Sequence, residues 1–201
     1  MPDWFAHIMF GVVLSTCLRL TREKRVIFLI GTVMPDFVRL LYLISTMIGF
    51  QSFTTLIASP LNNGAHSLLG VLAYSMFISI FFEKSLDLQQ STVKIIGTST
   101  FHVFLQKWQD ATNKPVFLLV LGGIAHLFLD TFMYPYGGGI YWLYPLNFAM
   151  FKWSFKVWWP SSIDAIITLA PFFVAALIVE FIIVVAKKKG IFPLSSDKTT
   201  R

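Results

Sequence analysis

The sequence has little charge and a single cysteine, and each shortage excludes a class of protein. Charged residues make up 13% of the 201 residues and hydrophobic residues 56%, whereas soluble domains carry roughly 25% charged residues. So little charge cannot cover a water-facing surface, and lipid is the expected covering. Cys17 alone can form neither an intrachain disulfide nor a thiolate metal cluster. Any metal ion must therefore be held by nitrogen and oxygen ligands.

Basic residues outnumber acidic ones by 16 to 10. This excess suits a membrane protein with basic cytoplasmic loops, and it does not resemble a nucleic-acid footprint. We therefore expect membrane lipids as partners and no nucleic acid.

Apolar runs predict an all-α, polytopic membrane protein, a bundle of about five transmembrane helices. The runs are residues 4–20, 26–50, 66–82, 116–134 and 163–186, against about 20 residues needed to cross a bilayer. The segment 85–115 is too polar to span and predicts amphipathic helices on the membrane surface. We expect one transmembrane domain over residues 1–190 and a polar tail over 191–201.

The strongest basic clusters, at residues 19–25 and 187–189, predict the orientation. Five spans place both clusters on one side, which we expect to be cytoplasmic, in an inner or plasma membrane. The N-terminus, the connection 50–66 and an aromatic loop at 135–162 then lie outside, and the C-terminus lies in the cytoplasm.

A few ionisable residues occur inside the apolar runs, where each costs several kcal/mol and calls for a partner or a function. They are His7, Asp36, Arg39, His66, His126, Asp130 and Glu180. His126 and Asp130 stand four apart and so share one helix face, where they can bind one ion or simply bond to each other. Glu180 lies near the basic end and is interpreted as a structural residue.

The predicted topology places His7, Asp36, His66, His126 and Asp130 in the outer half of the bundle, on four helices. Imidazoles and carboxylates without thiolates suit a divalent transition metal, zinc first and manganese or iron next. Taken singly, His7 can be an interfacial histidine and Asp36 a partner of Arg39. Their common height favours one metal site.

Several short motifs carry a family likeness. They are His7 with Gly11, the segment 31–36 ending in Pro35-Asp36, His66-Ser67-Leu68, the segment 123–130 from Gly123 to Asp130, and the segment 139–146. Their order resembles the family of membrane-bound metal-dependent hydrolases, which is distantly similar in ligand order to zinc-dependent phospholipase C and single-strand nucleases. The resemblance implies that Asp36, His66, His126 and Asp130 bind one metal ion. It also implies that His7 joins a bridging Asp130 at a second ion, if there is one.

The expected activity is metal-dependent hydrolysis of a phosphoester or related bond in a lipid or lipid-linked substrate. A suitably bound metal lowers the pKa of its water to about 7, and Asp36 or Asp130 is the candidate base. Arg39, one turn from Asp36, is the candidate ligand for a substrate phosphate. Two alternatives stay open: a proton- or ion-coupled transporter, and a non-catalytic scaffold closed by a metal.

Overall fold

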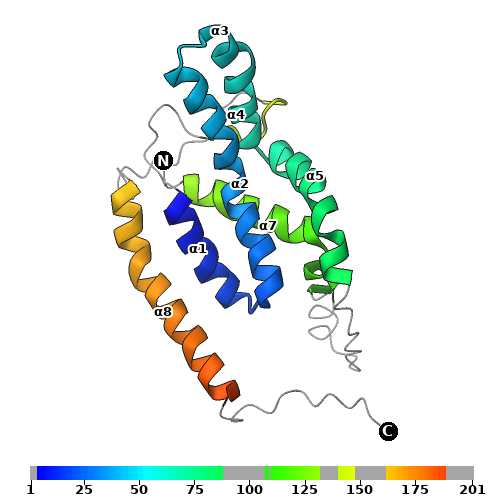
Figure 1. The fold of residues 1–201 in the computed structure, drawn as a ribbon, viewed down its shortest axis with the longest axis vertical. Coiled ribbons are helices and arrows are strands. Elements are labelled where there is room, and N and C mark those ends of the chain that lie inside the picture. Colours follow the sequence, from blue (N-terminus) through cyan, green and yellow to red (C-terminus); the bar gives the residue numbers. More distant parts are fainter. Residues whose placement is uncertain (1–3, 88–106, 109, 132–139, 148–161, 189–201) are drawn as a thin grey trace.

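The computed structural model describes residues 4–87, 107–108, 110–131, 140–147 and 162–188 (Figure 1). Every element in this part of the chain is a helix, as the all-α prediction requires. The elements are α1 (Trp4–Cys17), α2 (Arg22–Met47), α3 (Gln51–Phe53), the π-helix η1 (Thr54–Ala58), α4 (Ser59–Ala65), α5 (Leu68–Asp87), α7 (Pro115–Thr131) and α8 (Ser162–Lys188). Most of the predicted surface segment 85–115, most of the aromatic loop 135–162 and the tail 191–201 lie outside the described residues.

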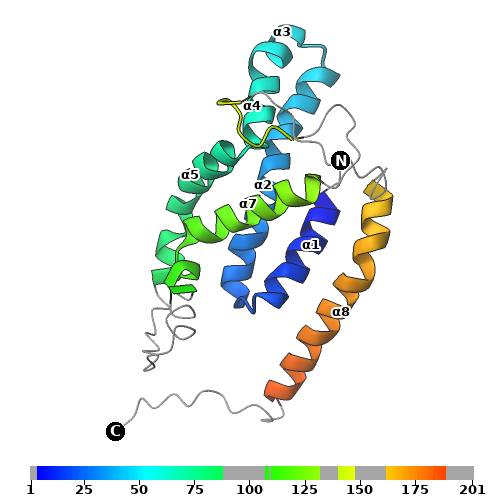
Figure 2. The same cartoon turned by 180° about the vertical axis from the view of Figure 1, so that it is seen from behind.

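Helix α7 is the centre of the bundle. It lies against α1 and α2, with α5 and α8 on opposite sides of that pair (Figures 1 and 2). Its leucines belong to three apolar clusters: Leu119 packs with Phe28 of α2, Leu129 with Met9 of α1, and Leu127 with α5. The helix has no Asp, Glu, Lys or Arg between Pro115 and Leu129, and ten of its 17 residues are buried, while Ile124 and Phe128 are exposed.

The crossing of α2 and α7 depends on glycines. A Cβ atom on Gly31 would lie 2.4 Å from the Leu119 carbonyl oxygen, and one on Gly122 would lie 2.2 Å from the Phe28 carbonyl oxygen. Both distances are far inside van der Waals contact, so the two backbones approach this closely only because neither residue has a side chain. The backbone of Thr32 is thereby brought against α7.

Two helices are long and apolar enough to cross a membrane: α2 over Arg22–Met47, and α8 over Ile166–Ala186. A third crossing results if the segments Gln51–Ala65 and Leu68–Phe82, bent by 88° at His66–Ser67, count as one broken span. The other two predicted spans correspond to α1 and α7, which are apolar but have 14 and 17 residues. The described helices therefore include two possible spans, or three with the broken one, and the five-span topology stays a prediction.

Polar contacts tie the helices together at the basic end of the bundle. Glu180 of α8 accepts hydrogen bonds from Arg25 of α2 and from Thr16 of α1, at 2.5 and 3.2 Å. Lys24 donates to the Asn113 side chain, two residues before α7, at 2.7 Å. Glu180 therefore has the structural role that its position predicts.

Replacing Gly122 by alanine tests the glycine crossing. The added methyl group would overlap the backbone of α2, so we expect a loss of about 1–3 kcal/mol of stability, seen as a lower melting temperature of the detergent-solubilised protein. Gly64→Ala is the matched control, because its Cβ would meet only the Tyr144 ring at 3.8 Å. Equal melting temperatures for the two variants would show that the close approach is not required.

Candidate metal centre

The fold brings together the predicted ligands from distant parts of the chain. His7 comes from α1, Asp36 from α2, His66 from the break between α4 and α5, and His126 and Asp130 from α7. All of these side chains are buried, and none is more than 6% exposed. The sequence predicts a common depth for these five residues, and the structure shows that they are neighbours.

Each carboxylate faces histidines with both of its oxygens. Asp36 Oδ2 lies 3.6 Å from His7 Nε2, and Asp36 Oδ1 lies 3.4 Å from His66 Nε2. Asp130 Oδ1 lies 3.3 Å from His7 Nε2, whereas Asp130 Oδ2 lies 3.3 Å from His126 Nε2 and 3.9 Å from His66 Nε2. The His7 and His126 rings stack with their centroids 3.8 Å apart, His66 lies beside His126 with centroids 5.3 Å apart, and both carboxylates face this group of rings.

Backbone carbonyls determine which nitrogen of two histidines faces the cluster. His126 Nδ1 lies 2.8 Å from the Thr32 carbonyl oxygen, and His66 Nδ1 lies 2.9 Å from the Asn62 carbonyl oxygen. A carbonyl accepts only from a protonated nitrogen, so Nδ1 carries the hydrogen in both rings. In the neutral ring Nε2 then presents a lone pair to the carboxylates, the usual arrangement of metal-binding histidines.

These lone pairs and carboxylate oxygens have no hydrogen-bond partner among the described residues. The atoms without a partner include His7 Nδ1 and Nε2, His66 Nε2, His126 Nε2 and both Asp130 oxygens. The separations of 3.3–3.9 Å exceed the roughly 2.7–3.2 Å of an N–H···O bond. Buried acceptors facing one another, with two carboxylates among them, need compensating positive charge, from protons on the rings or from a metal ion.

The same separations suit ligands of one ion. Two ligand atoms about 2.0–2.2 Å from a tetrahedral ion lie about 3.4 Å apart. The ligand atoms of His7, Asp36 and His126 lie within 4.8 Å of one another, as do those of His66, His126 and Asp130. Buried histidines and aspartates of this cluster can therefore hold a metal ion, and the donor set fits a divalent transition metal.

The break before α5 fixes His66. Ser67 donates to the Gly64 carbonyl at 2.6 Å and accepts from the Gly70 backbone N–H at 3.1 Å. A Cβ on Gly70 would lie 1.8 Å from the Gly64 carbonyl oxygen, so the bend needs glycine there. The backbone N–H of Leu68 donates to the Trp142 carbonyl at 3.0 Å, so part of the predicted aromatic loop supports the break.

Arg39 lies one helical turn beyond Asp36 and is half-buried. Within the described residues it forms no ion pair, so the interpretation of Arg39 as the charge partner of Asp36 receives no support. The sequence does not predict that the backbone carbonyls of Thr32 and Asn62 accept hydrogen bonds from the two histidines. Every residue has a backbone carbonyl, so no sequence pattern marks the ones that are used.

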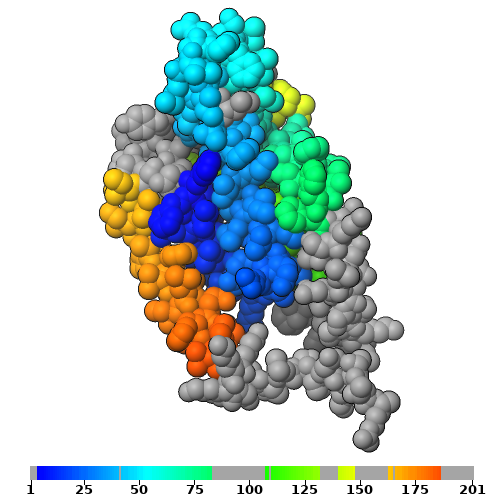
Figure 3. Space-filling model, in the orientation of Figure 1, coloured from blue at the N-terminus to red at the C-terminus, as the bar shows by residue number. Residues whose placement is uncertain are grey.

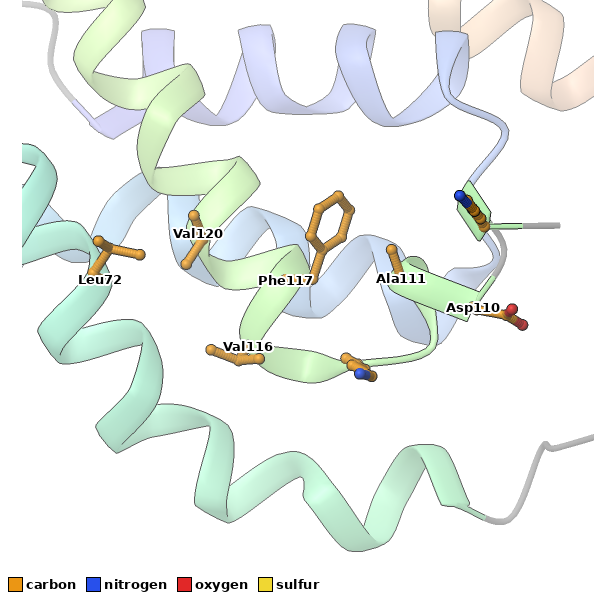
Figure 4. Close-up of a pocket in the computed structure, with 8 residues that line it drawn as sticks. Leu72, Asp110, Ala111, Val116, Phe117 and Val120 are labelled. Carbon is orange, nitrogen blue, oxygen red and sulfur yellow. The ribbon is translucent and has the colours of Figure 1, made fainter. Parts of the chain in front are cut away.

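A pocket of about 550 Å³ lies elsewhere, between α5 and the start of α7 (Figure 4). Its lining residues are Leu72, Lys107, Asp110, Ala111, Lys114, Val116, Phe117 and Val120. It shares no residue with the histidine–aspartate cluster, so the two are separate features.

Comparison of the chain with protein-family models, with curated proteins and with solved structures finds no significant match. The resemblance to membrane-bound metal-dependent hydrolases therefore remains a prediction from the motifs. The inference that these residues can hold a metal ion is based on the geometry of the described residues alone.

Zinc should stabilise the protein through this cluster. A ligand at 100 times its Kd adds about 2.7 kcal/mol to the stability of the folded state, so we expect the melting temperature of chelator-treated protein to rise by several degrees when zinc is added. Asp130→Ala removes both oxygens of one carboxylate and should abolish the rise. Glu23→Ala, at an exposed position in the first turn of α2, should keep it. The same rise in both variants would place zinc elsewhere.

Proposed function

We propose that the protein is a membrane-embedded, metal-dependent hydrolase that cleaves a phosphoester or related bond in a lipid or lipid-linked substrate. The observation that carries the proposal is the buried set of three imidazoles and two carboxylates with unpartnered ligand atoms. Ligands of this kind hold the metal ions that activate water in hydrolases, and their position on apolar helices suits a lipid environment.

The ligands would be His7, Asp36, His66, His126 and Asp130. Zinc is the first candidate, with manganese or iron as alternatives, because the donors are nitrogen and carboxylate oxygen. Bound there, the metal would supply a Lewis acid and lower the pKa of a water to about 7. Each carboxylate lies within 4 Å of more than one histidine nitrogen, which favours one ion or a bridged pair.

The chain's own residues would orient the reactants. Asp36 and Asp130 each have a second oxygen, so either can accept the proton of the attacking water. Arg39 extends from the turn after Asp36, and its guanidinium is suited to hold two phosphate oxygens. Burial of the cluster excludes bulk water from the reaction.

The proposal includes the five-span topology, with α1 and α7 also inside the membrane. The turn between α1 and α2 and the end of α8 lie at the same end of the bundle (Figure 1), so the basic clusters predicted to be cytoplasmic are together. Asp36 follows Arg22 by about 21 Å of helix, which supports a site beyond the middle of the bilayer. A lipid can reach such a depth from the side.

Metal content and hydrolysis test the proposal together. We expect elemental mass spectrometry of the purified protein to find a stoichiometric transition metal in the wild type, and almost none in His126→Ala or Asp130→Ala. The metal-loaded wild type should hydrolyse a fluorescent phospholipid in mixed micelles or the water-soluble bis(p-nitrophenyl) phosphate, and both variants should be inactive.

Glu23→Ala serves again as the control, with unchanged metal content and rate. A wild type that binds no metal even after zinc or manganese is supplied would refute the proposal. Stoichiometric metal without hydrolysis of either substrate would favour the scaffold alternative.

Arg39→Ala separates substrate binding from metal binding. Metal content should stay at the wild-type level, because Arg39 forms no ion pair with Asp36 or Asp130 in the described part of the chain. Loss of a charge-assisted hydrogen bond predicts a roughly 10- to 100-fold fall in kcat/KM. Arg39→Lys should recover part of it, and an unchanged kcat/KM for Arg39→Ala would exclude the phosphate role.

A further inference from the structure

The segment after Arg39 forms an apolar helical hairpin, here called the apical hairpin, over residues 40–65. It consists of the second half of α2, a turn at residues 48–50, and the returning helices α3, η1 and α4. It contains no Asp, Glu, Lys, Arg or His. Its two arms pack against each other, and it projects beyond α1 and α7 (Figures 1 and 2).

The backbone of the turn is satisfied within the hairpin. The N–H groups of Ile48, Gly49 and Phe50 donate to the carbonyls of Ile44, Thr46 and Ser45, at 3.1–3.2 Å. Gly49 adopts a φ of 73°, which glycine allows at little cost. These donors need no water.

Four hydroxyl groups of the hairpin, those of Ser45, Thr46, Thr54 and Thr55, are also bonded within it. The bonds are Ser45 to the Tyr42 carbonyl at 2.8 Å, Thr46 to the same carbonyl at 2.9 Å, Thr54 to the Ser45 hydroxyl at 3.0 Å, and Thr55 to the Gln51 carbonyl at 2.9 Å. The Thr54–Ser45 bond joins the two arms. Internal bonding of this kind is what a lipid environment demands of polar groups.

The apical hairpin projects from the rest of the bundle in the space-filling view (Figure 3), and large apolar side chains are exposed on both of its arms and at its tip. Met47 is 86% exposed, Leu56 76% and Phe50 64%. A water-facing surface of this composition is costly. The exposed residues of the outgoing arm continue an apolar stripe that already runs along α2, through Phe37 and Leu40. A protein partner would cover one face, whereas lipid covers both arms and continues along the span.

We propose that the apical hairpin lies in the lipid bilayer, so that its return arm is the upper half of a broken membrane crossing whose lower half is α5. The predicted outside connection 50–66 is then membrane-embedded. The return arm from Gln51 to Ala65 is about 21 Å long and runs back along α2, so that His66 reaches the level of Asp36. The break falls at His66, and its backbone groups bond to protein, as in discontinuous membrane helices.

Consequently Asp36 and His66 stand at the two base ends of a lipid-covered hairpin. The position of the hairpin does not depend on the proposed hydrolysis, and it can be measured in the metal-free protein.

Spin labels report the surroundings of the return arm. The chain has one cysteine, so a Cys17→Ser background accepts a single label at Leu56→Cys or Leu61→Cys, both exposed positions on the return arm. The full-length protein is reconstituted in phosphatidylcholine vesicles, and collision rates with oxygen and with a water-soluble nickel chelate are compared. Phe172→Cys on α8 is the lipid-facing reference and Glu23→Cys the aqueous one.

We expect oxygen collisions to exceed nickel collisions at both return-arm positions, as at Phe172. A nickel excess, as at Glu23, would overturn the proposal and return the segment to water. Low collision rates with both reagents and an immobilised spectrum would also overturn it, because a protein surface would then cover the hairpin. Two label positions guard against a variant that fails to fold.

Discussion

The hydrogen bond between His126 and the Thr32 carbonyl is the contact on which the site depends. It fixes the tautomer of the ring at the centre of the cluster, and it exists only because α2 and α7 cross at glycine distance. A larger residue at Gly31 or Gly122 would separate the helices and move Asp36 away from Asp130. The close packing of α2 and α7 therefore also determines the positions of the ligands, and a local change at the crossing would displace them.

The orientation of the rings decides the electrostatics of the cluster. With Nδ1 bonded to carbonyls, the buried Nε2 atoms of His66 and His126 cannot donate to the aspartates unless the rings become charged. Two carboxylates in a dry interior then need positive charge from protons on the rings or from a metal ion. Separations of 3.3–3.9 Å leave room for an ion between the atoms. Direct hydrogen bonds would bring the same atoms closer together.

Much of the site could be predicted from the sequence, because rare polar residues in apolar runs are conspicuous. The spacing of His126 and Asp130 specifies one helix face, and the height of Asp36 follows from counting residues along α2. The position of His66 could not be derived in this way. Its place depends on an 88° bend at Ser67, on the close approach of Gly70 to Gly64 and on support from Trp142. The sequence predicts residues 50–66 only as an outside connection, since Asn62, Asn63 and Gly64 are residues typical of loops, whereas the structure forms helices over residues 51–65.

The break in the helix at His66 allows this histidine to face the buried carboxylates. A continuous helix presents side chains from its outer surface and keeps its backbone groups occupied, whereas a bend frees backbone groups and turns the ligand inward. The freed groups are acceptable in an apolar interior only if protein satisfies them, and here Gly64, Ser67 and Trp142 do so. A histidine at the bend can therefore meet carboxylates from two other helices without a water-filled channel.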